Sequence, residues 1–399
     1  MSIQELYEIY LQYPSVQTDS RKVKPGDLFF ALKGDNFDGN AFAAGALADG
    51  AAYAIVDDAS VVQDDRYIGS NGKTTTKELL ITVLSAKYKT YATEGNLNNH
   101  IGVPLTLLKI GKDAEMAIVE MGANHIGEIA SYCKVANPNF GLITNCGKAH
   151  LEGFGSIEGV RKGKGELYDF LRNYHGTIFR NADLDYLEGM AHDIEEQITY
   201  GTANAQVIGK AIGEQAMLHV AMLTSGMETE LDTQLVGAYN LPNVLAAVAV
   251  GHYFGIDIDT IKEALSQYQP SNSRSQWMVK GDNNIILDAY NANPSSMKLA
   301  LENLAGMQGT NKWLLLGAMK EMGADSETEH RALIGLAQSL GFEQVILTGS
   351  EFEGLHYQYQ WFATSAEVRD YLLQNPIHNA TVLIKGSRGS KMEVVLEAF

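Results

Sequence analysis

The chain has 399 residues, a length typical of two or three domains. Hydrophobic residues make up 45% of it and charged residues 20%, which is ordinary for a globular protein with a sizeable core. Acidic residues outnumber basic ones by 48 to 30, giving a net charge of -18. Because proteins that bind nucleic acid or anionic membranes present a basic surface, this composition argues against both, and local features must hold any anionic ligand.

Cysteine usage and the N-terminus indicate the compartment. Cys133 and Cys146 are too few for a disulfide framework in a chain of this length, so we expect two buried thiols in a reducing environment. The N-terminus "MSIQELYEIYLQYPS" lacks the pattern of a signal peptide. No apolar run approaches the roughly 18 residues that span a bilayer. We therefore expect a cytoplasmic protein without membrane insertion.

Short β-branched runs alternate with longer helical ones along the chain, a pattern typical of α/β architecture. In the N-terminal part we expect a strand in "DLFFAL", a helix in "NAFAAGALADG" and a strand in "AAYAIVDD". A second unit starts at a glycine-rich loop and contains the apolar runs "AEMAIVEMGA" and "NFGLITNCG". After the turn-rich "QYQPSNSR", a third unit repeats the rhythm in "NIILDAYNANPSS", "KWLLLGAMKEMG", "EQVILTGS" and "TVLIKGSRG". We expect domains at 1–65, 66–270 and 271–399, with ligands at the carboxyl ends of the strands.

The stretch "GSNGKTTTKELL" has the composition of a phosphate-binding loop. Its two glycines allow successive backbone N–H groups to point at phosphate oxygens, and the helix that follows adds the positive end of its dipole. Lys73 supplies a charge for the phosphates, and the Thr74 hydroxyl is suited to Mg²⁺. The residues expected to bind ATP here are Gly69, Ser70, Asn71, Gly72, Lys73, Thr74 and Thr75. Because the GxxGKT spacing is shorter than the general motif, a turn that caps an ordinary helix is the alternative.

Polar residues follow two apolar runs of the second unit. Glu120 ends the run in "IVEMGANHIGEI", and His150 lies shortly after the run in "LITNCGKAHLEGFGS". Together with Thr74, a carboxylate and an imidazole at strand ends suit a Mg²⁺ site, although each alone is more often a surface residue. In "EGVRKGKGELYDFL", Lys162 and Lys164 indicate, on their own, a solvated basic turn.

Several segments, in the same order, resemble the Mur ligases, ATP-dependent amide-forming enzymes of peptidoglycan precursor synthesis. "TDSRKVKPGDLFFALKG" is similar to a uridine-nucleotide-binding start. "GSNGKTTTKE", "EGNLNNHIGVPLTLL", "VEMGANHIGEI" and "GKAHLEGFGSIEGV" are similar to the central ATPase domain, and "DAYNANPSSM", "GAMKEMG" and "KGSRGSKMEVV" to a C-terminal ligase domain. The resemblance implies a small N-terminal α/β domain, a central P-loop ATPase with a parallel-rich sheet, and a C-terminal Rossmann-like α/β domain.

The resemblance also implies a reaction. The C-terminal segments are similar to those of the member that joins D-alanyl-D-alanine to UDP-N-acetylmuramoyl-tripeptide, with ATP and Mg²⁺, through an acyl phosphate. The "DYAH" and "DNPR" segments that the tripeptide-forming member tends to carry do not occur here. We therefore expect a monomeric ligase whose partners are these small molecules.

Metal ligands are the first set of site residues that the resemblance implies. Lys73 and Thr74 would hold the ATP phosphates and Mg²⁺, while Glu120 and His150 would hold a second Mg²⁺. Lys164 is similar to the lysine that the family carbamylates, which turns a basic residue into an anionic oxygen ligand. Because that reaction needs the neutral amine, scarce at pH 7 for a lysine of pKa about 10.4, its surroundings should lower the pKa.

Substrate contacts are the second set. Asn240 in "GAYNLPN" matches an asparagine near the nucleotide base, and Tyr239 stands where the family commonly has histidine. From the C-terminal domain, Arg274 and Asp288 would reach the phosphates and the ribose. The residues expected at the uridine nucleotide are Ser20 and Arg21.

One segment typical of the family is missing. Family members place a helix and then an apolar strand ending in "ITG" ahead of the phosphate loop, and no such segment stands between Ile68 and Gly69. One alternative is therefore a homologue that binds the UDP-ligand but has lost ATP turnover; the intact Lys73, Glu120 and Lys164 argue against it, as does His150. Another alternative is a folylpolyglutamate synthase, against which "DAYNANPSSM" and the "DSR" start argue.

Overall fold

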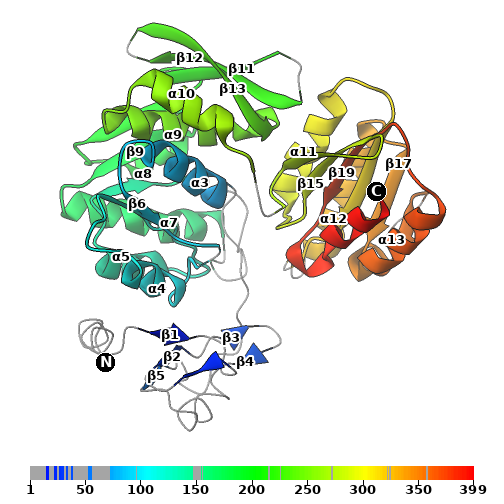
Figure 1. The fold of residues 1–399 in the computed structure, drawn as a ribbon, viewed down its shortest axis with the longest axis horizontal. Helices are drawn as coiled ribbons and strands as arrows, with labels where there is room; N and C mark the ends of the chain where they lie inside the picture. The colour runs from blue at the N-terminus through cyan, green and yellow to red at the C-terminus, as the bar shows by residue number, and fades with distance from the viewer. Residues whose placement is uncertain are drawn as a thin grey trace.

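The computed structural model describes most of the chain from Gly72 onward and short parts of the region before it. The described residues are 15–17, 22–24, 27–30, 33–34, 37–38, 53–55 and 72–399, apart from 96, 147–153, 155, 214–215, 225, 271–272, 321, 323–324 and 356–357. Figure 1 shows these residues as an N-terminal group of strands, a central body and a C-terminal body. None of the described helices combines the length and the apolar character that a membrane span requires.

The N-terminal strands form two small sheets. The first, in the order β1 (Val16–Gln17), β2 (Leu28–Phe30) and β5 (Tyr53–Ile55), is parallel. The second pairs β3 (Lys33–Gly34) with β4 (Phe37–Asp38) in antiparallel orientation. The strands expected in "DLFFAL" and "AAYAIVDD" are confirmed as β2 and β5, whereas the helix expected in "NAFAAGALADG" lies outside the described residues.

The central body is built on a six-stranded sheet. From edge to edge its strands are β13 (Met227–Val236), β12 (Met217–Thr224), β11 (Val207–Ile212), β10 (Gln197–Gly201), β9 (Thr177–Asn181) and β8 (Phe140–Leu142). The pairs from β8 to β11 are parallel, and β11, β12 and β13 are antiparallel. Ile178 and Phe179 of β9 pack into different hydrophobic clusters, so the parallel part is buried on both faces.

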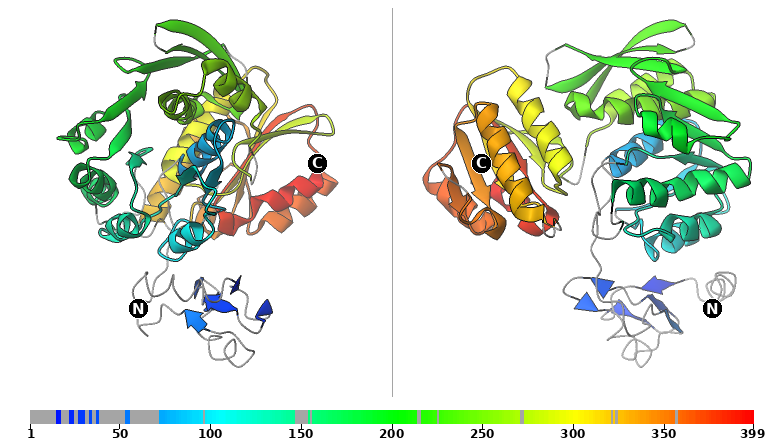
Figure 2. Two further views of the ribbon diagram at one scale, coloured as in Figure 1. Left: turned by 60° about the vertical axis from the view of Figure 1, so that its left-hand side comes forward. Right: turned by 180° about the vertical axis from the view of Figure 1, so that it is seen from behind.

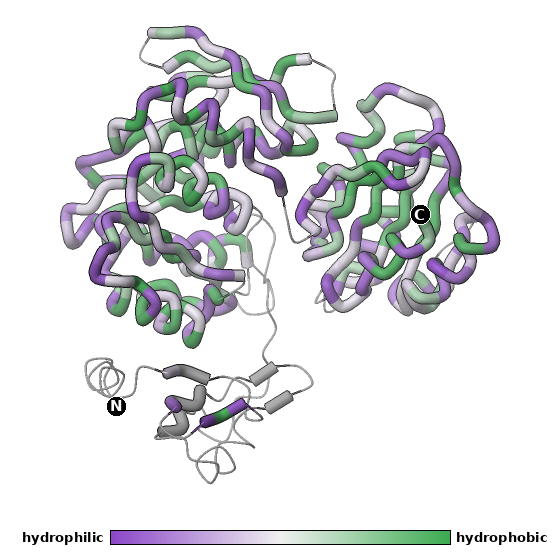
Figure 3. The backbone as a smooth tube through the Cα atoms, in the orientation of Figure 1, coloured by the Kyte–Doolittle hydropathy of each residue, from purple (hydrophilic) through white to green (hydrophobic). Residues whose placement is uncertain are grey.

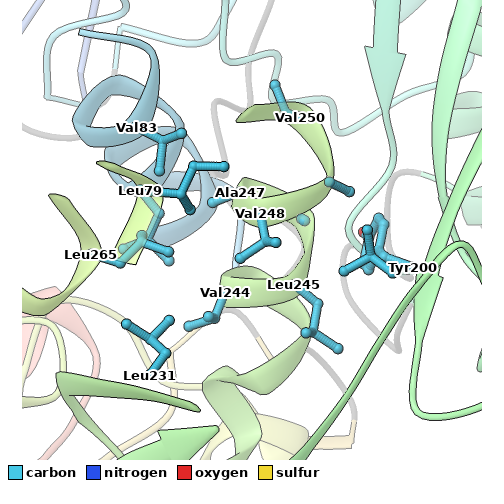
Figure 4. Close-up of a cluster of buried hydrophobic side chains, with 14 of the residues drawn as sticks. Leu79, Val83, Tyr200, Leu231, Val244, Leu245, Ala247, Val248, Val250 and Leu265 are labelled. Carbon is cyan, nitrogen blue, oxygen red and sulfur yellow. The ribbon is translucent and has the colours of Figure 1, made fainter. Parts of the chain in front are cut away.

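Helices cover both faces of this sheet. One cluster packs α3 (Lys73–Leu84), α9 (Leu241–Tyr253) and α10 (Ile258–Gln267) against it, with the short η3 (Ala238–Asn240) leading into α9. The other cluster includes residues of α4 (Gly102–Leu108), α5 (Glu128–Ala136), α7 (Ile157–Asn173) and α8 (Asp185–Met190). α9 is apolar on almost every side, as expected for a helix enclosed by others, and Figure 4 shows Val244 and Val248 pointing into the core that it shares with α3.

The parallel sheet of the central body is interrupted. β6 (Thr90–Ala92) and β7 (Met116–Ile118) pair in parallel as a separate two-stranded sheet. Within the described residues, no strand pairing joins β7 to β8. Ile118 of β7 and Leu142 of β8 nevertheless pack against the same hydrophobic cluster. The two sheet fragments therefore share a core without sharing a hydrogen-bonded edge.

The C-terminal body has its own six-stranded sheet. Its order is β14 (Gln276–Lys280), β15 (Asn283–Asp288), β19 (Thr381–Lys385), β16 (Lys312–Gly317), β17 (Gln344–Thr348) and β18 (Gln360–Phe362), with only the β14–β15 pair antiparallel. Leu314 and Leu316 face one cluster and Leu315 the other, which gives the hydrophobic strands seen in Figure 3. Because β19 lies between β15 and β16, the strand order reverses there, where open sheets bind ligands.

The helices of the C-terminal body also cover both faces. α11 (Pro294–Gly306) and α12 (Ser326–Ser339) contribute to one cluster, and α13 (Ser365–Gln374) and η7 (Met392–Ala398) to the other; η5 (Ser350–Phe352) and η6 (Arg388–Ser390) are short turns. α11 is on the side that faces the central body (Figures 1 and 2). Val236, at the end of β13, is fully buried in the C-terminal cluster, so the two bodies are packed together.

The expected α/β class with parallel-rich sheets is confirmed, and the strands expected in both larger units are present. The domain limits at 1–65, 66–270 and 271–399, and the Rossmann-like description of the last domain, stay predictions.

Candidate active site

The phosphate-loop sequence leads into α3 at Gly72. Gly72 has a left-handed backbone, with φ of 82°, and a Cβ atom there would lie 2.7 Å from Oδ1 of Asn243. The left-handed backbone favours glycine, and a larger residue would also have to displace the Asn243 side chain. Asn243 also accepts a hydrogen bond from the Thr76 hydroxyl at 3.1 Å, so α9 holds the first turn of α3 in place.

Glu120 follows β7 and is almost fully buried. Its Oε1 accepts hydrogen bonds from the Thr74 hydroxyl at 3.1 Å and from Nδ2 of Asn98 at 2.8 Å. Within the described part of the chain, its Oε2 has no hydrogen-bond partner, and Nζ of Lys77 stands 3.9 Å away. A buried carboxylate oxygen without a hydrogen bond is costly unless a ligand completes it, so this atom has the character of a metal-binding group.

Lys73 lies among charges from three elements. Burial lowers the pKa of its ammonium to about 7, the Glu120 carboxylate opposes the shift, and the charges of Lys164 and Arg274 add to it. The charges of Glu120, Lys164 and Arg274 therefore all act on Lys73 at the start of α3, and Lys77 adds a further cation beside Glu120. Such a surplus of positive charge in a partly buried site favours an anionic ligand such as a polyphosphate.

Lys164 lies on α7, whose first turn is capped by the Ser156 hydroxyl, which accepts from the backbone N–H of Gly159 at 3.1 Å. The Lys164 ammonium is partly buried and donates to the carbonyl oxygen of Asn145 at 3.0 Å. Burial lowers the pKa of Lys164 to about 8, and the nearby Cys146 thiol opposes the shift. The lowered pKa expected from sequence is therefore confirmed, and Lys164 is not part of a solvated basic turn.

These contacts locate the start of α3 relative to the interrupted sheet. Thr74 binds Glu120, directly after β7, and Lys164 binds Asn145, shortly after β8. Lys73 is close enough to Glu120 and Lys164 for both charges to act on it. A strand leading straight into Gly72 would therefore run between β7 and β8, where the sheet is interrupted.

The C-terminal body contributes Asp288 and Arg274. Asp288, at the end of β15, forms an ion pair with Nζ of Lys385 at 2.5 Å, and the Lys385 side chain is only 2% exposed. The Arg274 guanidinium lies 3.7 Å from the ring centroid of Tyr290. Asp288 and Lys385 end adjacent parallel strands, β15 and β19, so they lie at the edge where this fold binds ligands.

Asn240 is buried and fully engaged within the central body. Its Nδ2 donates to the carbonyl oxygen of Val236 at 2.9 Å, and its Oδ1 accepts from Nδ2 of Asn243 at 2.9 Å. Asn240 therefore supports Asn243, which in turn contacts the first turn of α3. A role near a nucleotide base stays a prediction.

Some of the predicted residues lie outside the described residues: Ser20, Arg21, Gly69, Ser70, Asn71 and His150. Those brought together at the start of α3 are Gly72, Lys73, Thr74, Thr75, Glu120, Lys164 and Arg274. Sequence reasoning missed Asn98, Asn243, Lys77 and Lys385. Asn98 and Asn243 lie in the segments "EGNLNNHIG" and "GAYNLPN", and Lys385 opens "KGSRG"; polar residues repeated inside such segments were the available signal.

The residues present fit a divalent cation. Among the described residues, no group of three His, Cys, Asp or Glu side chains is close enough to hold one alone. Thr74 and Glu120, whose Oε2 accepts no hydrogen bond from the described residues, nevertheless supply the hard oxygen donors that Mg²⁺ prefers, and such sites usually keep waters and substrate oxygens.

The fold, with α3 opening at Gly72-Lys73-Thr74 beside an acidic strand end, is that of an α/β protein of the phosphate-loop class. Models of three families match the chain: the Mur ligase middle domain over 68–251, the Mur ligase glutamate ligase domain over 273–388, and the Mur ligase family catalytic domain over 12–103. The chain belongs to the Mur ligase family.

Curated relatives match along the whole chain. The UDP-N-acetylmuramoyl-tripeptide–D-alanyl-D-alanine ligase of Escherichia coli (strain K12) is 34% identical, over 99% of this chain and 95% of the relative. The ligase of the same name from Bacillus subtilis (strain 168) is 32% identical, over 96% and 92%. The E. coli alignment runs over 437 residues although this chain has 399, so the relative carries residues that this chain lacks.

Solved structures of Mur ligases are also similar to this chain over almost its whole length. A crystal structure of MurF from Acinetobacter baumannii has a TM-score of 0.83 and 28% identity, covering 99% of this chain and 98% of that one. The MurF ligase from Thermotoga maritima in complex with ADP has a TM-score of 0.82 and 26% identity, covering 98% and 97%. A folylpolyglutamate synthase from Thermotoga maritima is 14% identical, with a TM-score of 0.60, and shares the fold alone.

Proposed function

We propose that this protein is an ATP-dependent amide ligase that adds D-alanyl-D-alanine to UDP-N-acetylmuramoyl-tripeptide in peptidoglycan precursor synthesis, acting as a monomer in the cytoplasm. The observation that carries the proposal is the cluster at the start of α3, where Lys73 and Thr74 meet Glu120, Lys164 and Arg274. The names of the full-length relatives support the choice of substrates.

The chemistry requires activation of a carboxylate, because a carboxylate is a poor electrophile. ATP transfers its γ-phosphoryl group to the terminal carboxylate of the tripeptide, which gives an acyl phosphate and ADP. The amine of D-alanyl-D-alanine then attacks the carbonyl carbon, loses a proton, and phosphate leaves from the tetrahedral intermediate. Catalysis of phosphoryl transfer depends mainly on positioning and charge neutralisation, which a cationic cluster supplies.

The start of α3 and Arg274 would bind the ATP phosphates. Burial holds the pKa of Lys73 at about 7, and a bound triphosphate would stabilise its charged form. Arg274, between α10 and β14, would add a second positive charge. Asp288, oriented by its ion pair with Lys385, would accept from the ribose hydroxyls, and Asn240 would support the base-binding region through Asn243.

The residues that would bind Mg²⁺ are Thr74, Glu120, His150 and carbamylated Lys164. The neutral amine of Lys164 attacks the carbon of CO₂, a C–N bond forms, and one proton is released, which leaves an anionic carbamate. Bound Mg²⁺ would neutralise phosphate charge in this site. Two observations support these assignments: among the described residues Oε2 of Glu120 accepts no hydrogen bond, and the pKa of Lys164 is lowered.

Ser20 and Arg21 would bind the uridine nucleotide. Because they precede the phosphate loop by some 50 positions, the UDP-ligand and ATP would be held by separate parts of the chain.

The test is ADP release with UDP-N-acetylmuramoyl-tripeptide, with and without D-alanyl-D-alanine. The proposal expects sustained release only when both substrates are present, with the amide product visible by mass spectrometry. The alternative raised by the missing segment before Gly69, a homologue that binds the UDP-ligand without ATP turnover, is not favoured by the full-length ligase relatives. Calorimetric binding of the UDP-tripeptide without any ADP release would identify that case.

A further inference from the structure

Residues 273–275, which lie between α10 and β14 and are called the hinge below, have an unusual backbone. Ser273 and Ser275 both have left-handed φ values, 56° and 47°, and they flank Arg274. Residues other than glycine adopt this conformation at an energetic cost, so it persists only where surrounding contacts hold it.

Those contacts come from both bodies. On the C-terminal side, the backbone N–H of Tyr290 donates to the Ser273 carbonyl oxygen, and the N–H of Ser275 donates to Oδ1 of Asp288, each at 3.3 Å. On the central side, the hydroxyl oxygens of Tyr239 and Ser275 are 2.8 Å apart. The Tyr239–Ser275 hydrogen bond therefore ties the hinge to the central body.

Tyr239 is itself held tightly. A Cβ atom on Gly237, which has φ of 88°, would lie 2.4 Å from Cε1 of Tyr239 and 2.9 Å from Oδ1 of Asn303 on α11. Burial, reinforced by the Asp288 charge, raises the pKa of Tyr239 above its ordinary value. The phenol therefore keeps its proton at neutral pH, and its ring packs closely against Gly237.

Arg274 lies between Ser273 and Ser275. Its guanidinium stacks on the Tyr290 ring, with 3.7 Å to the centroid. Its charge also acts on Lys73, so it is within electrostatic reach of the start of α3.

We propose that Tyr239 is a positioning residue for ATP, whose hydroxyl, through Ser275, fixes the backbone around Arg274 and keeps the guanidinium within electrostatic reach of Lys73 at the start of α3. The inference rests on the proposed function, in which Arg274 contacts the ATP phosphates. Tyr239 itself touches no reacting atom; it acts through the hinge.

The test is a double-mutant cycle with Tyr239→Phe, Ser275→Ala and the double variant. Each single change should raise the KM for ATP roughly three- to tenfold, the range for one lost hydrogen bond, with a smaller change in kcat and an unchanged KM for the UDP-tripeptide. The double variant should be no worse than either single one, because both remove the same contact. Tyr253→Phe, a half-exposed tyrosine at the end of α9, is the matched control and should behave as the unaltered protein.

An unchanged KM for ATP in Tyr239→Phe, or additive effects in the double variant, would overturn the inference. Arg274→Ala separates it from the proposed function: if that change leaves the KM for ATP unaltered, the phosphate contact is wrong. If no ATP turnover occurs at all, hydrogen exchange of the Ser275 amide decides the hinge contact. It should become faster in Tyr239→Phe and not in Tyr253→Phe, and equal protection in both overturns the contact.

Discussion

Replacing Lys164 with alanine should remove most of the ligase activity, whereas the same change at Lys162 should leave it intact. Both lysines lie on α7, but Lys162 is exposed, while Lys164 is partly buried and donates to Asn145. Only Lys164 is close enough to Lys73 for its charge to be felt there. The pair thus offers a matched comparison within one helix.

The magnitude follows from the pKa. With a pKa of about 8 instead of 10.5, roughly one Lys164 side chain in ten is neutral at pH 7, compared with about one in three thousand for an ordinary lysine. The reactive amine is therefore about 300 times more abundant at Lys164. Because only the neutral form attacks CO₂, carbamylation should increase as pH rises through about 8 and decline below it.

The assay combines NMR with kinetics. With ¹³C-bicarbonate, the unaltered protein and Lys162→Ala should each show one carbamate resonance, and Lys164→Ala should show none. ADP release should fall in CO₂-depleted buffer and return when bicarbonate is added. Lys164→Glu should recover a little activity that no longer depends on bicarbonate, because it supplies a permanent carboxylate. Full activity of the unaltered protein without CO₂ and without a carbamate resonance would refute the reasoning.

Three further predictions concern the phosphate loop, the interrupted sheet and the C-terminal body. Lys73→Ala should abolish ADP release but leave UDP-tripeptide binding nearly unchanged, because separate parts of the chain hold the two ligands; equal loss of both on calorimetry contradicts this. Inserting a family-type helix and strand between Ile68 and Gly69 should tighten ATP binding and raise the melting temperature by several degrees, because β7 and β8 would gain a shared neighbour. Identical titrations and melts would show that the short connection suffices. Lys385→Met should lower the free energy of unfolding by about 3 kcal/mol or more, because it leaves Asp288 without its partner, and adding Asp288→Asn should restore part of it. An unchanged denaturant midpoint in Lys385→Met would contradict the last prediction.

The residues around Glu120 show which contacts could be predicted from the sequence and which could not. Glu120 was predicted because it ends an apolar run, and the structure brings it to Thr74 as expected. Its contact with Asn98 was not predicted, because Asn98 belongs to a loop 22 residues away whose direction only the packed sheet decides. Lys77 was not predicted either, although it is buried and donates to the carbonyl oxygen of Thr93.

The interrupted sheet was anticipated in part. The missing family segment before Gly69 predicts that a parallel sheet lacks an inner strand. Sequence could not say between which strands the interruption falls, because strand order depends on crossovers that span the whole body. The separation of β6 and β7 from β8 supplies that answer.

The sequence by itself determined the features that depend on a short stretch of residues, namely the strands and the phosphate loop. Apolar runs predicted the strands, because buried parallel strands need apolar residues on both faces, and glycine, lysine and threonine in succession predicted the loop at Gly72. Only the tertiary structure decided which distant side chains meet: Asn243 against Gly72, Lys385 against Asp288, and Tyr239 against Ser275. Each of these pairs joins residues far apart in the chain, and its geometry depends on the packing of whole helices and sheets, which no short stretch of sequence encodes.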